Sequence, residues 1–276
     1  MRIRVFLRIV VAALLLASAA TPALAQDVNL TPKRIVFDDR ARGAAQVIVF
    51  NRGDAAAKFK IELIDRVMKP DGSVIEAPGP TIDSAKSFIR FSPRRVTLAP
   101  GESQVVRIQA RPPADLPAGE YRTHLTVSAI PSTDAGPQAA RGSGERKTIQ
   151  IRLVPIYGMS IPIIVRRGAL SAEVGIEDIR PVQSNGARAV SFVLVRKGTS
   201  SAYGDIDVEL VGRGASRSIA VAKGLGVYPE ITRRTVVLPL RADAPALGPG
   251  ARLHVVYRED HARRGSVLAE QDVLLP

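Results

Sequence analysis

Apolar and polar residues alternate along one stretch near the middle of the chain. Ile149, Ile151 and Leu153 are separated by Gln150 and Arg152. Successive side chains of a β-strand point to opposite faces, so this pattern predicts a strand with one apolar face. Such a strand either completes its own sheet or lends its alternate side chains to a partner that lacks a strand.

The rest of the chain also has the pattern of short strands. Runs rich in valine, isoleucine, phenylalanine and threonine are separated by turn sequences such as 70–73, 99–102 and 184–186. No amphipathic helix with caps is evident, and strands without helices are typical of sandwich folds. We therefore expect an all-β protein of two tandem immunoglobulin-like β-sandwich domains, residues 26–165 and 166–276.

The beginning of the chain has the pattern of a secretory leader. Basic residues precede an apolar run from Ile9 to Ala20, and the small residues Ala23 and Ala25 follow at the spacing of a cleavage site. We expect residues 1–25 to be a signal peptide and the mature chain to be a soluble protein of the periplasm. No later segment has the roughly 18 uninterrupted apolar residues of a transmembrane helix, so no stable membrane insertion is expected.

The composition narrows the class of partner. The chain has no cysteine, so its stability must come from buried area. The net charge is +13, and the leader holds three of the positive residues and no acidic one, which leaves 13 − 3 = +10. Such a charge suits an acidic protein, a free carboxylate or an anionic surface. Export and an aromatic content of 4% without tryptophan argue against nucleic acid. Most of the arginines, Arg166 and Arg167 included, lie in expected loops and are typical of a solvated surface.

Motifs of catalysis are missing from the sequence. It contains no nucleophile elbow, no phosphate-binding loop and no His-Glu-x-x-His, and its three histidines are scattered. His124 alternates with apolar neighbours and is expected in the core or at a sheet edge. We therefore expect a protein that is not an enzyme and has no cofactor, no catalytic residue and no metal site. A hydrolase with an unrecognised site is the enzyme-class alternative.

Four segments resemble one family in the same order along the chain. They are Val28–Asp38, with an arginine before a short apolar run, Phe91–Ile108, with its Leu-x-Pro-Gly turn, Leu125–Pro131, and Ile149–Leu153. These segments are similar to those of the PapD-like periplasmic chaperones of the chaperone-usher pathway, and residues 28–165 carry the resemblance. The resemblance implies a chaperone that binds strand-deficient pilus or fimbrial subunits by donor-strand complementation. It would deliver them to an outer-membrane usher for fimbria biogenesis and cell wall organization.

The same resemblance implies which residues contact the subunit. Ile149, Ile151 and Leu153 stand at the donor positions, and Arg34 stands where the family holds the subunit's C-terminal carboxylate.

The family's anchor lysine would fall at Gly158, so the second cation of that clamp is missing from its expected place. Arg152 or Lys147 could substitute for it. The competing hypothesis is a non-catalytic envelope adaptor or surface-binding protein whose central strand is buried in its own sheet.

Overall fold

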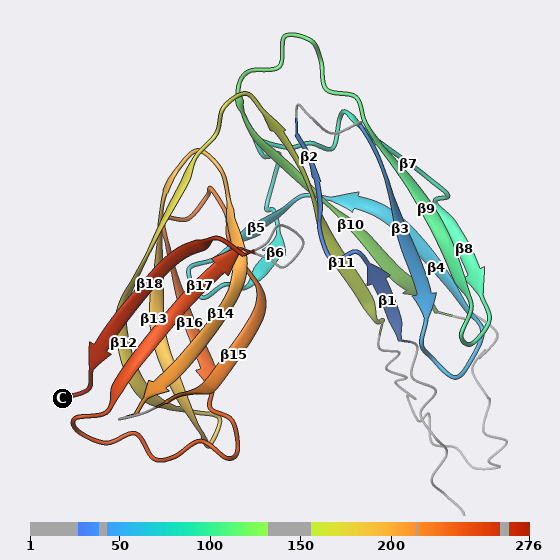
Figure 1. Ribbon diagram of the computed structural model, residues 1–276. Coiled ribbons are helices and arrows are strands. Elements are labelled where there is room, and N and C mark those ends of the chain that lie inside the picture. Colours follow the sequence, from blue (N-terminus) through green and yellow to red (C-terminus); the bar gives the residue numbers. More distant parts are fainter. Residues whose placement is uncertain (1–26, 39–42, 132–155, 213–214, 260–264) are drawn as a thin grey trace, which may run out of the picture.

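The computed structural model describes residues 27–38, 43–131, 156–212, 215–259 and 265–276. Within these ranges all regular structure is β-strand, and two sandwiches are arranged as the arms of a V (Figure 1). No helix in the described part is long and apolar enough to cross a membrane. The prediction of an all-β, two-sandwich fold is confirmed.

The first sandwich contains the strands up to β11. They are β1 (Val28–Thr31), β2 (Ile35–Phe37), β3 (Ala44–Asn51), β4 (Ala57–Ile64), β5 (Arg66–Met68), β6 (Val74–Glu76), β7 (Ile89–Ser92), β8 (Arg95–Leu98), β9 (Ser103–Ala110), β10 (Gly119–Ile130) and β11 (Gly158–Arg167).

The strand order of the first sandwich is that of an immunoglobulin-like domain. One sheet has the order β1-β3-β9-β7 and the other the order β2-β11-β10-β4-β8. These sheets correspond to the A-B-E-D and G-F-C arrangements of that fold. Alternation decides which side chains face inward: Val47 and Val49 of β3 are buried in the core, whereas Ile48 and Phe50 face outward.

The first extended segment of this sandwich, which contains β1 and β2, is divided between the two sheets. β1 pairs with β3, and β2 then pairs in parallel with β11. The ladder between β2 and β11 involves only Ile163–Val165, although β11 begins at Gly158. On that side, residues 158–162 of β11 therefore have no strand partner among the described residues.

The second sandwich begins after a short link at residues 168–171. Its strands are β12 (Ala172–Ser184), β13 (Ala187–Gly198), β14 (Ala202–Val211), β15 (Ser216–Val227), β16 (Arg233–Pro239), β17 (Arg252–Glu259) and β18 (Val267–Leu274). They form two sheets, of order β12-β13-β16 and β15-β14-β17-β18, around a separate apolar core.

A hairpin of the first sandwich packs against the second. β5 and β6 pair with each other and lie between the two arms in Figure 1. The backbone amide of Thr235 donates to the Pro70 carbonyl at 2.7 Å, and the Met68 amide donates to Oε1 of Glu230 at 2.7 Å. Met68 also packs with Ile164 and Tyr228 in a small apolar cluster. The two sandwiches are therefore joined by packed side chains as well as by the link.

Candidate functional site

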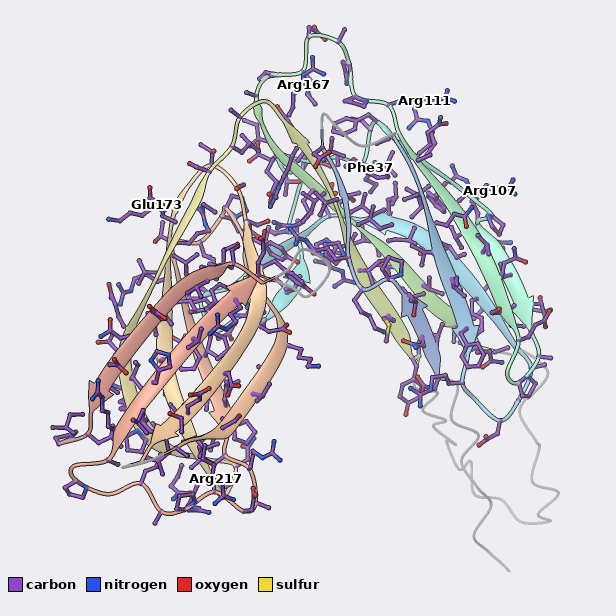
Figure 2. The ribbon with its side chains drawn as sticks, viewed as in Figure 1. Phe37, Arg107, Arg111, Arg167, Glu173 and Arg217 are labelled. Atoms are coloured by element: carbon purple, nitrogen blue, oxygen red, sulfur yellow. The ribbon has the colours of Figure 1, made fainter. Side chains whose placement is uncertain are left out.

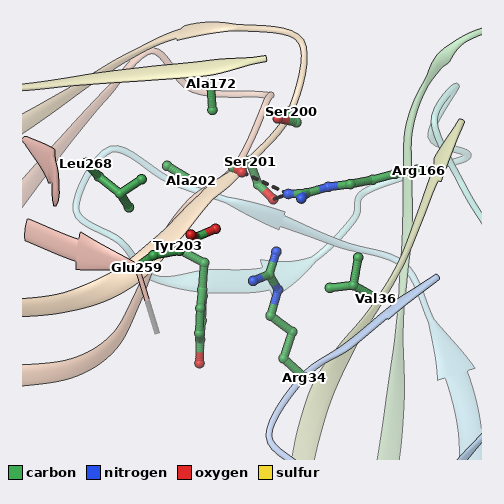
Figure 3. A pocket seen from close by; sticks show the side chains of 10 residues that line it. All are labelled: Arg34, Val36, Arg166, Ala172, Ser200, Ser201, Ala202, Tyr203, Glu259 and Leu268. Atoms are coloured by element: carbon green, nitrogen blue, oxygen red, sulfur yellow. Dashed lines mark hydrogen bonds between the residues drawn. The ribbon is translucent and has the colours of Figure 1, made fainter. Parts of the chain in front are cut away.

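Arg34 lies in a pocket between the two sandwiches. It directly precedes β2, and the side chain extends toward β14 of the second sandwich (Figure 3). Its guanidinium carbon lies 4.5 Å from the centre of the Tyr203 ring, which is the geometry of a cation–π contact. The pocket encloses about 330 Å³. The arginine predicted from the sequence is thus at the junction of the two sandwiches.

The Arg34 guanidinium forms no ion pair with a described residue, although the charge of Glu120 acts on it from farther away. No carboxylate of the described residues lies within ion-pair distance, and its Nε has no hydrogen-bond acceptor among them. Burial lowers the pKa of Arg34, and the nearby positive charge of Arg166 lowers it further. The group stays charged because the ordinary pKa of arginine is far above neutrality. A partly buried cation of this kind suits an incoming anion, most of all a carboxylate that can accept two hydrogen bonds.

Arg166 forms a second wall of the pocket and is already paired. Its Nε donates to Oε2 of Glu120 at 2.9 Å, and Nη2 donates to the backbone oxygen and the hydroxyl of Ser201 at 3.0 and 3.2 Å (Figure 3). The same Glu120 oxygen accepts hydrogen bonds from the amide and the hydroxyl of Ser201, both at 3.0 Å. The Glu120 side chain is only 1% exposed. This network ties β10 and β11 to the start of β14, so its role is to hold the two sandwiches together.

The interpretation of Arg166 as a solvated loop cation is wrong. It lies in β11, opposite Glu120 of β10, and its side chain is 24% exposed. The neighbouring Arg167 lies on the outside of the molecule (Figure 2). Its Nη2 donates to the Ala114 carbonyl at 2.7 Å.

The far side of the pocket belongs to the second sandwich and has mixed chemistry. Ala172, Ala202 and Leu268 supply apolar surface, and Glu259 supplies a carboxylate. Oε2 of Glu259 accepts a hydrogen bond from the Ser266 hydroxyl at 3.0 Å. The pocket therefore has the positive Arg34 on one wall and the negative Glu259 on the other. No ion pair joins the two.

The unpaired part of β11 leads directly away from this pocket. Ile161, Ile163 and Val165 are buried in the first core, with Met159 packed against it, whereas Ile164 faces the second sandwich. The ladder with β10 continues one residue beyond β11, since the Ala129 amide donates to the Tyr157 carbonyl at 2.9 Å. The backbone groups of residues 158–162 that face away from β10 have no strand partner among the described residues, so this edge can accept a further strand.

Gly158 stands where the resemblance to the chaperone family would place the anchor lysine. A Cβ at this position would lie 3.0 Å from the Ser128 hydroxyl and 3.0 Å from the Val127 carbonyl oxygen, so a larger residue would require these neighbours to give way slightly. A cation nevertheless lies beside this part of β11. Nζ of Lys33 is 3.4 Å from Sδ of Met159 and also contacts Oδ1 of Asn29. Lys33 was not expected at the site.

The remaining predicted contact residues cannot be placed. Ile149, Ile151, Leu153, Arg152 and Lys147 all lie outside the described residues. Their roles as donor side chains and as substitute cations therefore stay predictions.

His124 lies near the interface but outside the pocket. It is buried, as the sequence led us to expect, and its ring packs edge-on against Tyr228 with 6.4 Å between centroids. Burial, and then the positive charges of Arg122 and Arg66, lower the pKa of His124 to about 3. The ring is neutral at ordinary pH, which fits a structural role.

Besides Lys33, several residues of the site were missed in the sequence. Glu120 and Tyr203 contact Arg166 and Arg34 from elements far away along the chain, and Glu259 and Leu268 come from two further strands. The local sequence around each is ordinary strand sequence. Only the folded arrangement brings them together, so no signal in a single sequence identifies them.

Fold and site together define an all-β protein of two sandwiches with a cationic pocket between them. Among the described residues, no group of histidine, aspartate and glutamate side chains could hold a metal ion.

Comparison with known proteins gives a likeness to solved structures only. No protein-family model and no curated protein matches the chain. The YadV chaperone is 13% identical, with 90% of this chain and 100% of that chain covered and a TM-score of 0.43. The class 5 fimbriae chaperone CfaA is 11% identical, with 91% and 99% covered and a TM-score of 0.42. CsuC from the Csu pili of Acinetobacter baumannii, in complex with the tip subunit CsuE, is 14% identical, with 88% and 97% covered and a TM-score of 0.45. At these identities the likeness assigns no function to this chain.

Proposed function

We propose that this protein is a periplasmic chaperone that binds strand-deficient pilus or fimbrial subunits by donor-strand complementation. It stabilises them without catalysis and delivers them to an outer-membrane usher. In this account residues 1–25 are a cleaved signal peptide, and residues 26–165 and 166–276 are the two domains. The observation that carries the proposal is the unpaired edge of β11 at residues 158–162, which ends beside the unpaired cation Arg34.

The unpaired edge of β11 and the cation Arg34 would bind two parts of the same subunit strand. A subunit that lacks a strand has an open apolar groove and an unpaired edge of its own. A strand of the subunit that pairs with β11 would have its backbone groups satisfied. Its C-terminal carboxylate would then accept hydrogen bonds from Arg34, and Lys33 adds a second positive charge beside Met159.

The donor side chains come from the segment that precedes β11. Ile149, Ile151 and Leu153 have the same odd-numbered spacing as Met159, Ile161 and Ile163, the core-facing residues of β11. We infer that in the complex they fill the groove of the subunit. Each fully buried aliphatic side chain contributes roughly 1.5–3 kcal/mol, so three of them would dominate the affinity.

The experiment is co-expression with a strand-deficient fimbrial subunit and purification of the complex. We expect wild-type chain to hold the subunit in solution, and a variant with Ile149, Ile151 and Leu153 all changed to serine to lose it while it keeps its own melting temperature. The matched control changes Ile48 and Val105 to serine, since both are exposed on the opposite sheet. If the triple variant unfolds instead, these residues belong to the protein's own core and the adaptor hypothesis gains.

A further inference from the structure

The pocket at Arg34 is larger than a carboxylate requires. It encloses about 330 Å³, and its walls reach across to Glu259 and Leu268 of the second sandwich. Figure 3 shows the guanidinium of Arg34 on one side of the pocket and the carboxylate of Glu259 on the other, with the Tyr203 ring beside them. A group that enters to reach Arg34 therefore also meets the second sandwich.

We propose that this second wall is a specificity subsite for the last side chain of the bound partner. It selects a C-terminal residue with an apolar stem and a hydrogen-bond donor at its tip, with lysine the best fit. The proposal rests on the proposed function, because it assumes that a C-terminal carboxylate binds Arg34.

The charges of the pocket carry this inference. Arg166 is neutralised by Glu120, which leaves Arg34 and Glu259 as the two charged groups of the pocket lining that form no ion pair with a described residue. A free carboxylate bound at Arg34 satisfies one of them. A cationic or donor tip on the same residue would satisfy the other, and an acidic side chain would be repelled by Glu259.

The apolar lining accounts for the stem. Ala202 is buried, Ala172 and Leu268 are partly buried, and all three line the same pocket as Arg34 and Glu259. A methylene chain or a ring that lies against them is removed from water, which favours a long side chain over a short polar one.

The test uses a series of short synthetic peptides of alternating valine and threonine that differ only in the last residue. Binding of fluorescein-labelled peptides with C-terminal lysine, leucine or glutamate is measured by anisotropy, each as the free acid and as the amide. We expect the order lysine, leucine, glutamate among the free acids, with a difference of about tenfold or more between the first and the last. Glu259→Lys should reverse the preference between lysine and glutamate, and Glu270→Gln, on the exposed part of β18, should leave it unchanged.

Two failures can be told apart. If the free acids bind no tighter than the amides, the carboxylate site itself is wrong and the proposed function loses its main support. If the free acids bind tighter than the amides but equally to one another, the site stands and the specificity subsite is wrong. The same conclusion holds if Glu259→Lys stays folded and keeps the original order.

Discussion

The guanidinium carbon of Arg34 lies 4.5 Å from the centre of the Tyr203 ring, so a cation of the first sandwich is positioned by an aromatic side chain of the second. The contact holds the cation in place although it forms no ion pair with a carboxylate of the described residues. Both sandwiches are therefore needed to form the site, even though the edge of β11 belongs to the first.

Arg34→Ala is expected to abolish subunit capture with little effect on folding. Removal of a partly buried cation without an ion pair relieves a desolvation cost, so the melting temperature should stay the same or rise slightly. Co-purification measures capture, and circular dichroism measures the melting temperature. Arg107→Ala is the matched control because Arg107 is exposed on β9, in the sheet opposite that of β11 (Figure 2). Retained capture by Arg34→Ala would remove the carboxylate site from the account.

Glu120→Ala is expected to destabilise the protein. The change removes one partner of a buried ion pair, leaves Arg166 without its carboxylate and removes the acceptor of two hydrogen bonds from Ser201. Loss of a single partner of such a pair costs roughly 3 kcal/mol. Urea unfolding measures this cost.

Glu62→Ala provides the comparison for that measurement. Glu62 forms a 2.8 Å pair with Lys60 in which the Lys60 and Glu62 side chains are 48% and 42% exposed, so its loss should cost less than about 1 kcal/mol. Equal effects of the two substitutions would mean that Glu120 does not join the sandwiches.

His124 makes stability depend on pH in the acid range. Its folded pKa of about 3 lies below the unfolded value of 6.5, so between these values the unfolded chain binds the extra proton. The contribution of neutral His124 to the free energy of unfolding is fully present above pH 6.5. It is lost as the pH falls toward 3, by at most about 1.4 kcal/mol per pH unit. His124→Leu should therefore flatten the fall in urea stability between pH 6.5 and pH 4.5. An unchanged slope would show that the histidine is protonated, or exposed, in the folded protein.

Ile151→Asp is expected to prevent capture and leave the fold intact. A carboxylate in the middle of the donor stretch cannot enter an apolar groove without a large desolvation cost. The melting temperature of the free protein tests the alternative, in which this stretch is buried in the protein's own sheet. In that case the same substitution would unfold the protein. Ile151→Val, which keeps the apolar shape, should retain capture.

Much of the fold follows from alternation along the strands. Val47 and Val49 of β3, and Val106 and Ile108 of β9, are buried as their spacing predicts, because a half-buried sheet must separate its faces with period two. Arg34 was also predicted as a site residue, although only through the resemblance of the segment around it.

The partners of Arg34 and Arg166 could not be predicted in the same way. Glu120 and Arg166 are adjacent only because β10 and β11 pair in one particular register. Tyr203 and Ser201 reach the site through the arrangement of the two sandwiches, which depends on contacts such as the one between Met68 and Glu230. Periodicity within a segment carries no information on such long-range contacts.

Hydrogen exchange at the start of β11 tests the central claim most directly. The backbone amides of Gly158 and Ser160 face away from β10, because Tyr157, opposite Ala129, is in a hydrogen-bonded pair of the β10–β11 ladder. Their exchange is followed in the free protein and with the lysine-ended free-acid peptide. If the peptide adds as a strand, exchange at these two amides should slow strongly while β18 in the second sandwich is unaffected. Tight binding of the peptide with unchanged exchange at Gly158 and Ser160 would contradict strand addition at this edge.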